Sequence, residues 1–142
     1  WKNRDNSVGF NTPVLKDGIL YGISGMNSLF CINVDDGQTV WNTPLGEEGQ
    51  TQAERSGGGR RGRGGRRGGR RGGRGYGSVV DANSALLALI PSGQLTVFAP
   101  GAAFSPLATY KVAEAGTYAY PIPSQFGLFI KDQNSVTLWA TQ

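Results

Sequence analysis

Few side chains in this 142-residue sequence are of the types that carry acid–base, nucleophilic or metal chemistry. Histidine, the usual general base and zinc ligand, is missing. The single cysteine, Cys31, stands between Phe30 and Ile32, an apolar setting that predicts a buried, unreactive thiol. Half of the ten carboxylates fall in predicted turns, where their oxygens can accept backbone N–H groups: Asp17, Asp35, Asp36, Asp81 and Asp132. The sequence therefore predicts no catalytic residue and no metal ligand.

Positive charge is concentrated in one segment. Nine of the fourteen lysines and arginines lie within residues 55–74, an interval without an acid. Outside it, five cations face ten carboxylates, a net charge of −5, so the remainder of the chain is acidic. Residues 57–75 consist of eleven glycines and eight arginines, which we call the Arg-Gly tract. Its arginines are Arg60, Arg61, Arg63, Arg66, Arg67, Arg70, Arg71 and Arg74.

The Arg-Gly tract has too few apolar side chains to build a core, and guanidinium groups bind phosphate and sulfate well. Three interpretations stay open at this point: a solvated loop without a specific partner, docking on the acidic remainder of the chain, or non-specific contact with a polyanion. The polyanion would be nucleic acid, an acidic polysaccharide or an anionic lipid surface. RNA-binding Arg-Gly-Gly segments usually interleave aromatic residues, but here Tyr76 stands outside the tract, which argues against sequence-specific recognition.

The segments on both sides of the tract are predicted to be strands. Gly and Pro recur every few residues and separate apolar runs that are too short for helices. The run "SALLALI" contains strong helix formers, but it is only seven residues long and ends at Pro91, which favours a strand. The sequence therefore predicts an all-β fold. Its expected strands include "ILYGIS", "LFCINV", "QTVWNT", "LLALI", "LTVFA", "ATYKVA", "LFIKD" and "SVTLWAT".

The strand pattern repeats along the chain. Residues 13–37, 78–101 and 121–142 each read as three strands separated by short turns. Matching Leu29, Leu95 and Val136 gives spacings of 66 and 41 residues. Removing an insertion of about 25 residues from the first spacing leaves both near 40, the length of one four-stranded propeller blade. We therefore expect a partial β-propeller of four-stranded antiparallel blades, about two and a half in number.

The expected organisation has three parts. Residues 1–54 form one blade, with the tail of a preceding blade at residues 1–10. Residues 55–77 form a disordered Arg/Gly-rich loop between blades. Residues 78–142 form further blades, the last of them incomplete. The chain starts at Trp1 without an initiating methionine, so we expect a fragment of a longer protein.

The stretch "CINVDDGQTVW", residues 31–41, resembles the repeat of the PQQ-like (quinoprotein-type) β-propellers, A-x-D-x-x-T-G-x-x-x-W. Gly37 and Trp41 match it, while Cys31, Asn33 and Asp36 replace the alanine, aspartate and threonine. The preceding "PVLKDGILYGISGMNSLF" is also similar to that family.

A glycine at position 37 supplies the positive φ that the "VDDG" turn needs. The resemblance implies that Trp41 docks one blade on the next, and we assign the same structural role to Trp139. The second copy has neither this turn nor a tryptophan, and Tyr110 is its expected aromatic substitute.

Quinoprotein dehydrogenases of this family hold pyrroloquinoline quinone (PQQ) and a calcium or lanthanide ion, with Glu, Asn and Asp side chains that we cannot place here. We therefore expect a non-catalytic propeller fragment without a cofactor, which binds other blades, protein partners or polyanions. The alternative is the C-terminal part of a PQQ-dependent oxidoreductase whose cofactor site lies on blades outside this chain. The family's usual location predicts a periplasmic or secreted protein. No apolar run is long enough to predict a transmembrane segment.

Overall fold

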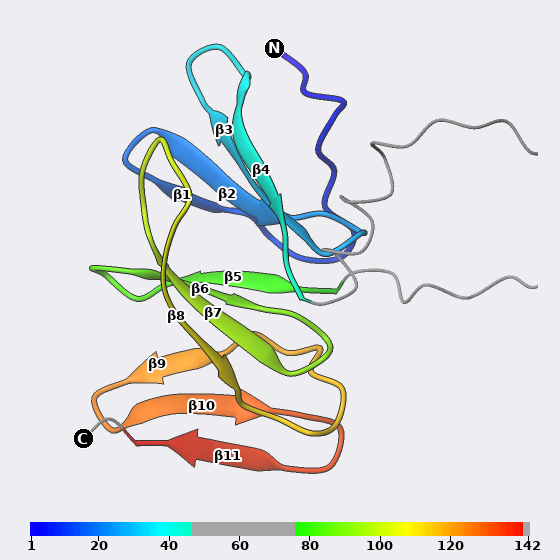
Figure 1. The fold of residues 1–142 in the computed structure, drawn as a ribbon, viewed down its shortest axis with the longest axis vertical. Coiled ribbons are helices and arrows are strands. Elements are labelled where there is room, and N and C mark those ends of the chain that lie inside the picture. Colours follow the sequence, from blue (N-terminus) through cyan, green and yellow to red (C-terminus); the bar gives the residue numbers. More distant parts are fainter. Residues whose placement is uncertain (47–75, 141–142) are drawn as a thin grey trace, which may run out of the picture.

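The computed structural model describes residues 1–46 and 76–140, and the regular structure of this part is entirely β (Figure 1). The predicted all-β fold is confirmed. The described part contains β1 (Val14–Lys16), β2 (Ile19–Ile23), β3 (Ser28–Asn33), β4 (Thr39–Pro44), β5 (Ser78–Asp81), β6 (Leu86–Leu89), β7 (Gln94–Ala99), β8 (Ser105–Lys111), β9 (Ile122–Ser124), β10 (Gly127–Lys131) and β11 (Val136–Trp139).

The strands form three separate antiparallel sheets, each built from strands that are consecutive in the chain. Sheet 1 has the order β1-β2-β3-β4, sheet 2 the order β5-β6-β7-β8, and sheet 3 the order β9-β10-β11. Neighbouring strands are joined by short connections, as expected where Gly, Asn and Asp recur between apolar runs. The three repeated segments of the sequence therefore fold as three sheets of three or four strands.

Sheet 2 lies between the other two sheets, and β6 shows why. All four of its residues are buried, and they alternate between two cores. Leu86 and Ala88 pack with sheet 1, whereas Leu87 and Leu89 pack toward sheet 3. A strand that is covered on both faces needs a continuous apolar run, and "LLAL" is such a run. The predicted preference of this run for a strand is confirmed.

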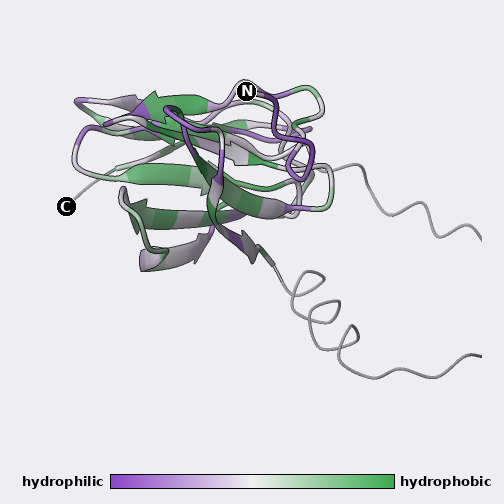
Figure 2. Cartoon of the chain, turned by 90° about the horizontal axis from the view of Figure 1, so that it is seen from above, coloured by the Kyte–Doolittle hydropathy of each residue, from purple (hydrophilic) through white to green (hydrophobic). Residues whose placement is uncertain are grey.

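The core between sheets 1 and 2 is the larger of the two. It holds the fully buried Tyr21, Ile23 and Leu29 of sheet 1 together with Leu86 and Phe98 of sheet 2. The core between sheets 2 and 3 is smaller and includes Leu87, Leu89, Leu95, Val112, Ala113 and Ile130. Figure 2 shows hydrophobic residues in many of the strands, with the hydrophilic N-terminal segment at their side.

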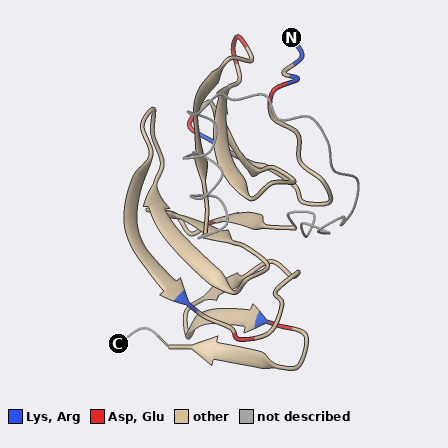
Figure 3. Ribbon diagram, turned by 45° about the vertical axis from the view of Figure 1, so that its right-hand side comes forward, with Lys and Arg blue, Asp and Glu red and all other residues tan. Residues whose placement is uncertain are grey.

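The charged residues of the described part lie in the N-terminal segment, in turns and bends, and at or beside strand ends (Figure 3). One ion pair links two sheets, because Lys16 Nζ of β1 lies 2.8 Å from Asp81 Oδ1 of β5. The Arg-Gly tract with its eight arginines lies outside the described residues. The expectation of a disordered loop at residues 55–77 therefore stays a prediction, as does the division into domains.

Within residues 1–46 and 76–140 there is no helix long and apolar enough to cross a membrane.

Candidate functional site

Trp41 lies at the junction between sheets 1 and 2. It stands on β4, opposite Cys31 of β3. Its indole ring packs against Phe98 of β7 at a centroid distance of 6.3 Å and against Phe104 at 5.4 Å. Its Nε1 donates a hydrogen bond of 3.1 Å to the carbonyl oxygen of Gly101, in the connection between β7 and β8. The ring of Trp41 thus joins sheet 1 to the turn that follows the third strand of sheet 2.

Tyr21 of β2 completes this junction. Its hydroxyl oxygen accepts the backbone N–H of Gly101 at 2.8 Å, and its ring lies 6.1 Å from that of Trp41. Both polar backbone groups of Gly101 are therefore bound by side chains of sheet 1. Burial raises the pKa of Tyr21 above its usual value, so this hydroxyl stays neutral over the physiological range.

Trp1 makes the same kind of contact on sheet 1. Its Nε1 donates a 2.6 Å hydrogen bond to the carbonyl oxygen of Val34, in the turn that follows β3. Its ring lies on Gly37, where an added Cβ would come within 2.4 Å of the indole. Gly37 also has a φ of 73°, a conformation that L side chains rarely adopt. Glycine is therefore required there for two reasons, the backbone turn and the close approach of Trp1.

The role of Trp1 was missed in the sequence analysis, which treats residues 1–10 only as a strand tail. Trp1 and Trp41 are 40 residues apart, the same interval that separates the repeats, and this spacing was the available signal. Three asparagines reinforce the contact. Asn3 Nδ2 donates to Gly37 O at 2.9 Å and Asn6 Nδ2 to Thr39 Oγ1 at 2.7 Å. Asn42 Nδ2 in turn donates to Asn6 Oδ1 at 2.8 Å.

The junction between sheets 2 and 3 lacks the indole contact that Trp1 and Trp41 make on sheets 1 and 2. The strand register shows which residue of sheet 2 corresponds to Trp41. The pairing of β3 with β4 shifts by one residue directly after the pair Cys31–Trp41. The pairing of β7 with β8 shifts in the same way after the pair Val97–Ala108. Ala108 therefore occupies the place of Trp41. Tyr110, the expected aromatic substitute, pairs with Leu95 two residues further along β8.

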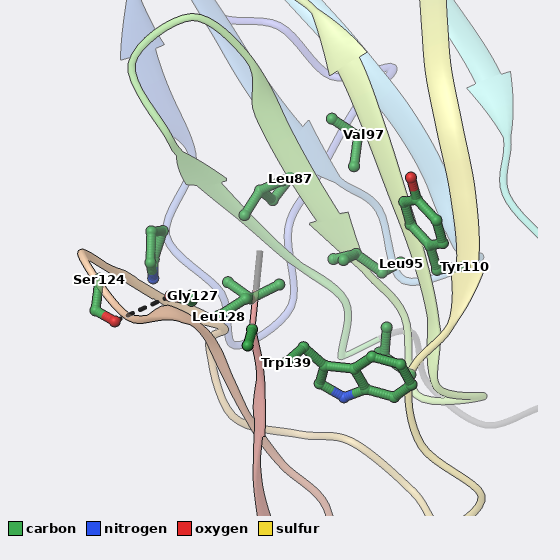
Figure 4. A pocket seen from close by; sticks show the side chains of 11 residues that line it. Leu87, Leu95, Val97, Tyr110, Ser124, Gly127, Leu128 and Trp139 are labelled. Carbon is green, nitrogen blue, oxygen red and sulfur yellow. Dashed lines mark hydrogen bonds between the residues drawn. The ribbon is translucent and has the colours of Figure 1, made fainter. Parts of the chain in front are cut away.

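A cavity of about 460 Å³ lies at this third junction (Figure 4). Sheet 2 contributes Leu87, Leu95, Val97 and Tyr110 to its lining, and sheet 3 contributes Leu128 and Trp139. Trp139, predicted to dock a blade, stands opposite Leu128 on the outer strand of sheet 3. It faces back toward sheet 2 and remains 44% exposed, whereas Trp41 faces forward from sheet 1 to sheet 2.

Three ionisable side chains of the described part are either buried or bound to backbone N–H groups of turns. Burial raises the pKa of the Cys31 thiol to about 11, so the thiol is neutral at pH 7. Asp36 Oδ1 accepts the N–H of Gln38 at 2.9 Å, the turn bond predicted from the sequence. The backbone N–H groups of Asn134 and Ser135 lower the pKa of Asp132. The described residues contain no group of three or more His, Cys, Asp or Glu side chains that could hold a metal ion.

An aromatic cluster on the surface joins the segments that precede the first strand of each sheet. Phe10 stacks on Tyr76 at 5.4 Å, and Tyr76 meets Tyr118 edge-on at 5.8 Å. Phe10 is 75% exposed and Tyr118 56%. Two hydrogen bonds hold the segments together, from Asn11 Nδ2 to the carbonyl oxygen of Gly77 and from the N–H of Thr12 to the hydroxyl of Tyr120. We call Phe10, Tyr76 and Tyr118 the surface aromatic cluster.

A scan against protein-family models and a search of curated proteins found no match to this sequence.

Proposed function

We propose that this chain is part of a PQQ-like β-propeller and serves as a non-catalytic binding module. The observation that carries the proposal is the repeated indole contact. Trp1 and Trp41 each donate their indole N–H to a carbonyl in the turn after the third strand of the sheet that they contact. In a radial array each sheet must bind the next in the same way, so a contact repeated at the spacing of one blade is what this architecture requires.

The partner that we propose for the module is a polyanion. Arg74, the last arginine of the tract, precedes Tyr76 of the surface aromatic cluster by two residues in the sequence. Arginine binds phosphate, and exposed aromatic rings offer a surface on which bases can stack. This combination favours single-stranded nucleic acid among the polyanions, without sequence-specific recognition.

The test is deletion of residues 57–75. We expect the deleted chain to keep its circular dichroism spectrum and to lose its binding to fluorescein-labelled single-stranded DNA, measured by anisotropy. Binding by the intact chain should fall steeply with salt, because phosphate contacts release counterions. The matched variant Phe10→Ala/Tyr118→Ala keeps every arginine. It should weaken binding to DNA by several-fold and leave retention on a heparin column unchanged.

Two outcomes decide the polyanion proposal. Unchanged DNA binding after the deletion would overturn the polyanion assignment. Equal loss of heparin and DNA binding in the aromatic variant would show that the cluster acts through folding and not through stacking. The propeller assignment is tested separately by Trp41, as argued in the Discussion.

The alternative predicted from the sequence, a part of a PQQ-dependent oxidoreductase, has its own test. The chain is incubated with PQQ and calcium, and the quinone absorbance is followed through gel filtration. Absorbance that travels with the protein would support the oxidoreductase. The extracytoplasmic location also stays a prediction, which fractionation of cells producing the protein would test.

A further inference from the structure

Three comparable places follow one another along the stack: the contact of Trp1 with sheet 1, where no described sheet covers the 66% exposed indole, and the two junctions between sheets. We call them the first, second and third junction. At the first junction the indole of Trp1 lies on Gly37, and at the second the indole of Trp41 lies between sheets 1 and 2. At the third junction Ala108 stands where the register calls for the indole. A cavity of about 460 Å³ lies at this junction, and Val97, the strand partner of Ala108, is part of its lining, whereas Ala108 itself is not.

Four residues of the cavity lining correspond to residues around Trp41. The pair Leu87–Val97 of sheet 2 takes the place of Tyr21–Cys31 of sheet 1. Across the junction, the pair Leu128–Trp139 of sheet 3 takes the place of Leu86–Phe98 of sheet 2. Leu87, Val97, Leu128 and Trp139 all line the cavity. The cavity therefore includes part of the space that an indole at position 108 would reach.

We propose that this cavity binds a small planar aromatic molecule of the size of an indole ring. Its lining is mainly aliphatic, with the rings of Tyr110 and Trp139 at its wall (Figure 4). Such walls favour flat apolar ligands, which gain dispersion contacts and offset or edge-on aromatic contacts. The volume lies within the range of small-molecule sites. The inference depends on the comparison of the junctions, and it holds whether or not the sheets belong to a closed propeller.

The depth of the site also fits a small ligand and not an extended chain. Leu87 and Leu95 are 7% and 3% exposed at the sheet 2 wall, whereas Trp139 is 44% exposed on the outer strand of sheet 3. The ligand would thus enter beside Trp139 and reach the buried leucines. Binding of a molecule as small as indole is expected to be weak, with a Kd on the order of 0.1 mM.

The experiment titrates the full chain with indole by isothermal titration calorimetry. The variant Ala108→Trp supplies the missing ring from β8 itself, so it should weaken indole binding at least tenfold. Thr109→Trp is the matched control, because it adds the same ring one residue away on the opposite face of the strand. It should bind indole as the wild type does. Saturable binding lost only in Ala108→Trp supports the proposal, and no saturable binding to wild type overturns it.

A second measurement keeps the proposal testable if Ala108→Trp fails to fold. Indole added to the wild-type chain should shift the methyl resonances of Leu87, Val97 and Leu128, observed by NMR. Shifts confined to other methyl groups would contradict the site. Cyclohexanol, a non-planar probe, should bind at least tenfold more weakly, and equal binding would overturn the aromatic class. N-acetyltryptophanamide could also bind, and we would then compare the two affinities. If it bound tenfold more tightly than indole, the site would be assigned to a tryptophan side chain of a partner, and the proposal of a small-molecule ligand would be overturned.

Discussion

At the scale of single residues, the backbone of Gly101 joins two sheets. The carbonyl oxygen of Gly101 accepts from Trp41, and its N–H donates to Tyr21. The connection between β7 and β8 therefore cannot shift without breaking both bonds. A buried backbone N–H or C=O group that loses its hydrogen-bond partner lowers the stability of the fold, because water cannot replace the lost bond. Trp41 adds the burial of a large ring between Phe98 and Phe104, so packing and hydrogen bonding act at the same point.

Two substitutions of Trp41 separate these contributions. Trp41→Phe keeps an aromatic ring and removes the N–H donor, which we expect to lower the free energy of unfolding by about 1 kcal/mol. Trp41→Ala also empties the junction and should cost about 3–5 kcal/mol. Urea unfolding followed by circular dichroism measures both. Tyr21→Phe is the control, since it removes the other bond to Gly101 and should couple non-additively with Trp41→Phe. Equal stability of the wild type and Trp41→Ala would contradict the docking role and the propeller proposal with it.

At the scale of elements, β1 and β5 are linked by charge as well as by packing. Lys16 Nζ lies within 2.9 Å of both carboxylate oxygens of Asp81. The hydrogen bond from Lys16 is the main cause that lowers the pKa of Asp81, and the N–H of Asn83 also contributes. The pair is exposed to solvent, so salt screens it and its effect on stability is small. The pair can nevertheless be recognised experimentally, because its contribution to stability depends on pH.

The direction in which stability changes with pH follows from the lowered pKa of Asp81. Because folding lowers the pKa of Asp81 below its ordinary value of 3.8, the folded chain favours the ionised carboxylate. The stabilisation by the ion pair is present above about pH 4 and is lost as the pH falls through the pKa of Asp81 in the folded chain. We expect Asp81→Asn to show a weaker loss of stability than the wild type between about pH 5 and 2. Thermal unfolding across this range measures it, and identical profiles would contradict the role of the pair. Asp132 shifts in the same direction, so Asp132→Asn serves as a comparison.

At the scale of the whole molecule, the stability of the stack decreases from sheet 2 outward to sheet 3. The core between sheets 1 and 2 contains several fully buried side chains and two indole or phenol hydrogen bonds across the junction. At the other junction there is a cavity of about 460 Å³, and all residues of β9 and β11 are exposed. Local opening is expected where buried apolar contacts are few.

Amide hydrogen exchange should reveal this gradient. We expect the amides of β3 and β6 to be the most protected and those of sheet 3 to exchange at least tenfold faster, β9 and β11 before the central strand β10. Mass spectrometry of peptic peptides or NMR measures the rates. Indole at saturating concentration should slow exchange in β10 if it occupies the cavity. Equal protection of sheets 1, 2 and 3 would contradict the gradient.

The sequence by itself determined the local structure. Short apolar runs between Gly and Pro specified strands, the end of "SALLALI" at Pro91 favoured β6 over a helix, and the "VDDG" turn required Gly37, because each depends on neighbours within a few residues. Only the tertiary structure decided which sheets meet, that Trp1 lies on Gly37, that Phe10, Tyr76 and Tyr118 gather on the surface, and that a cavity lies between sheets 2 and 3. The alternation of a strand says which residues share a face, but which other face covers them depends on contacts between residues far apart in the chain.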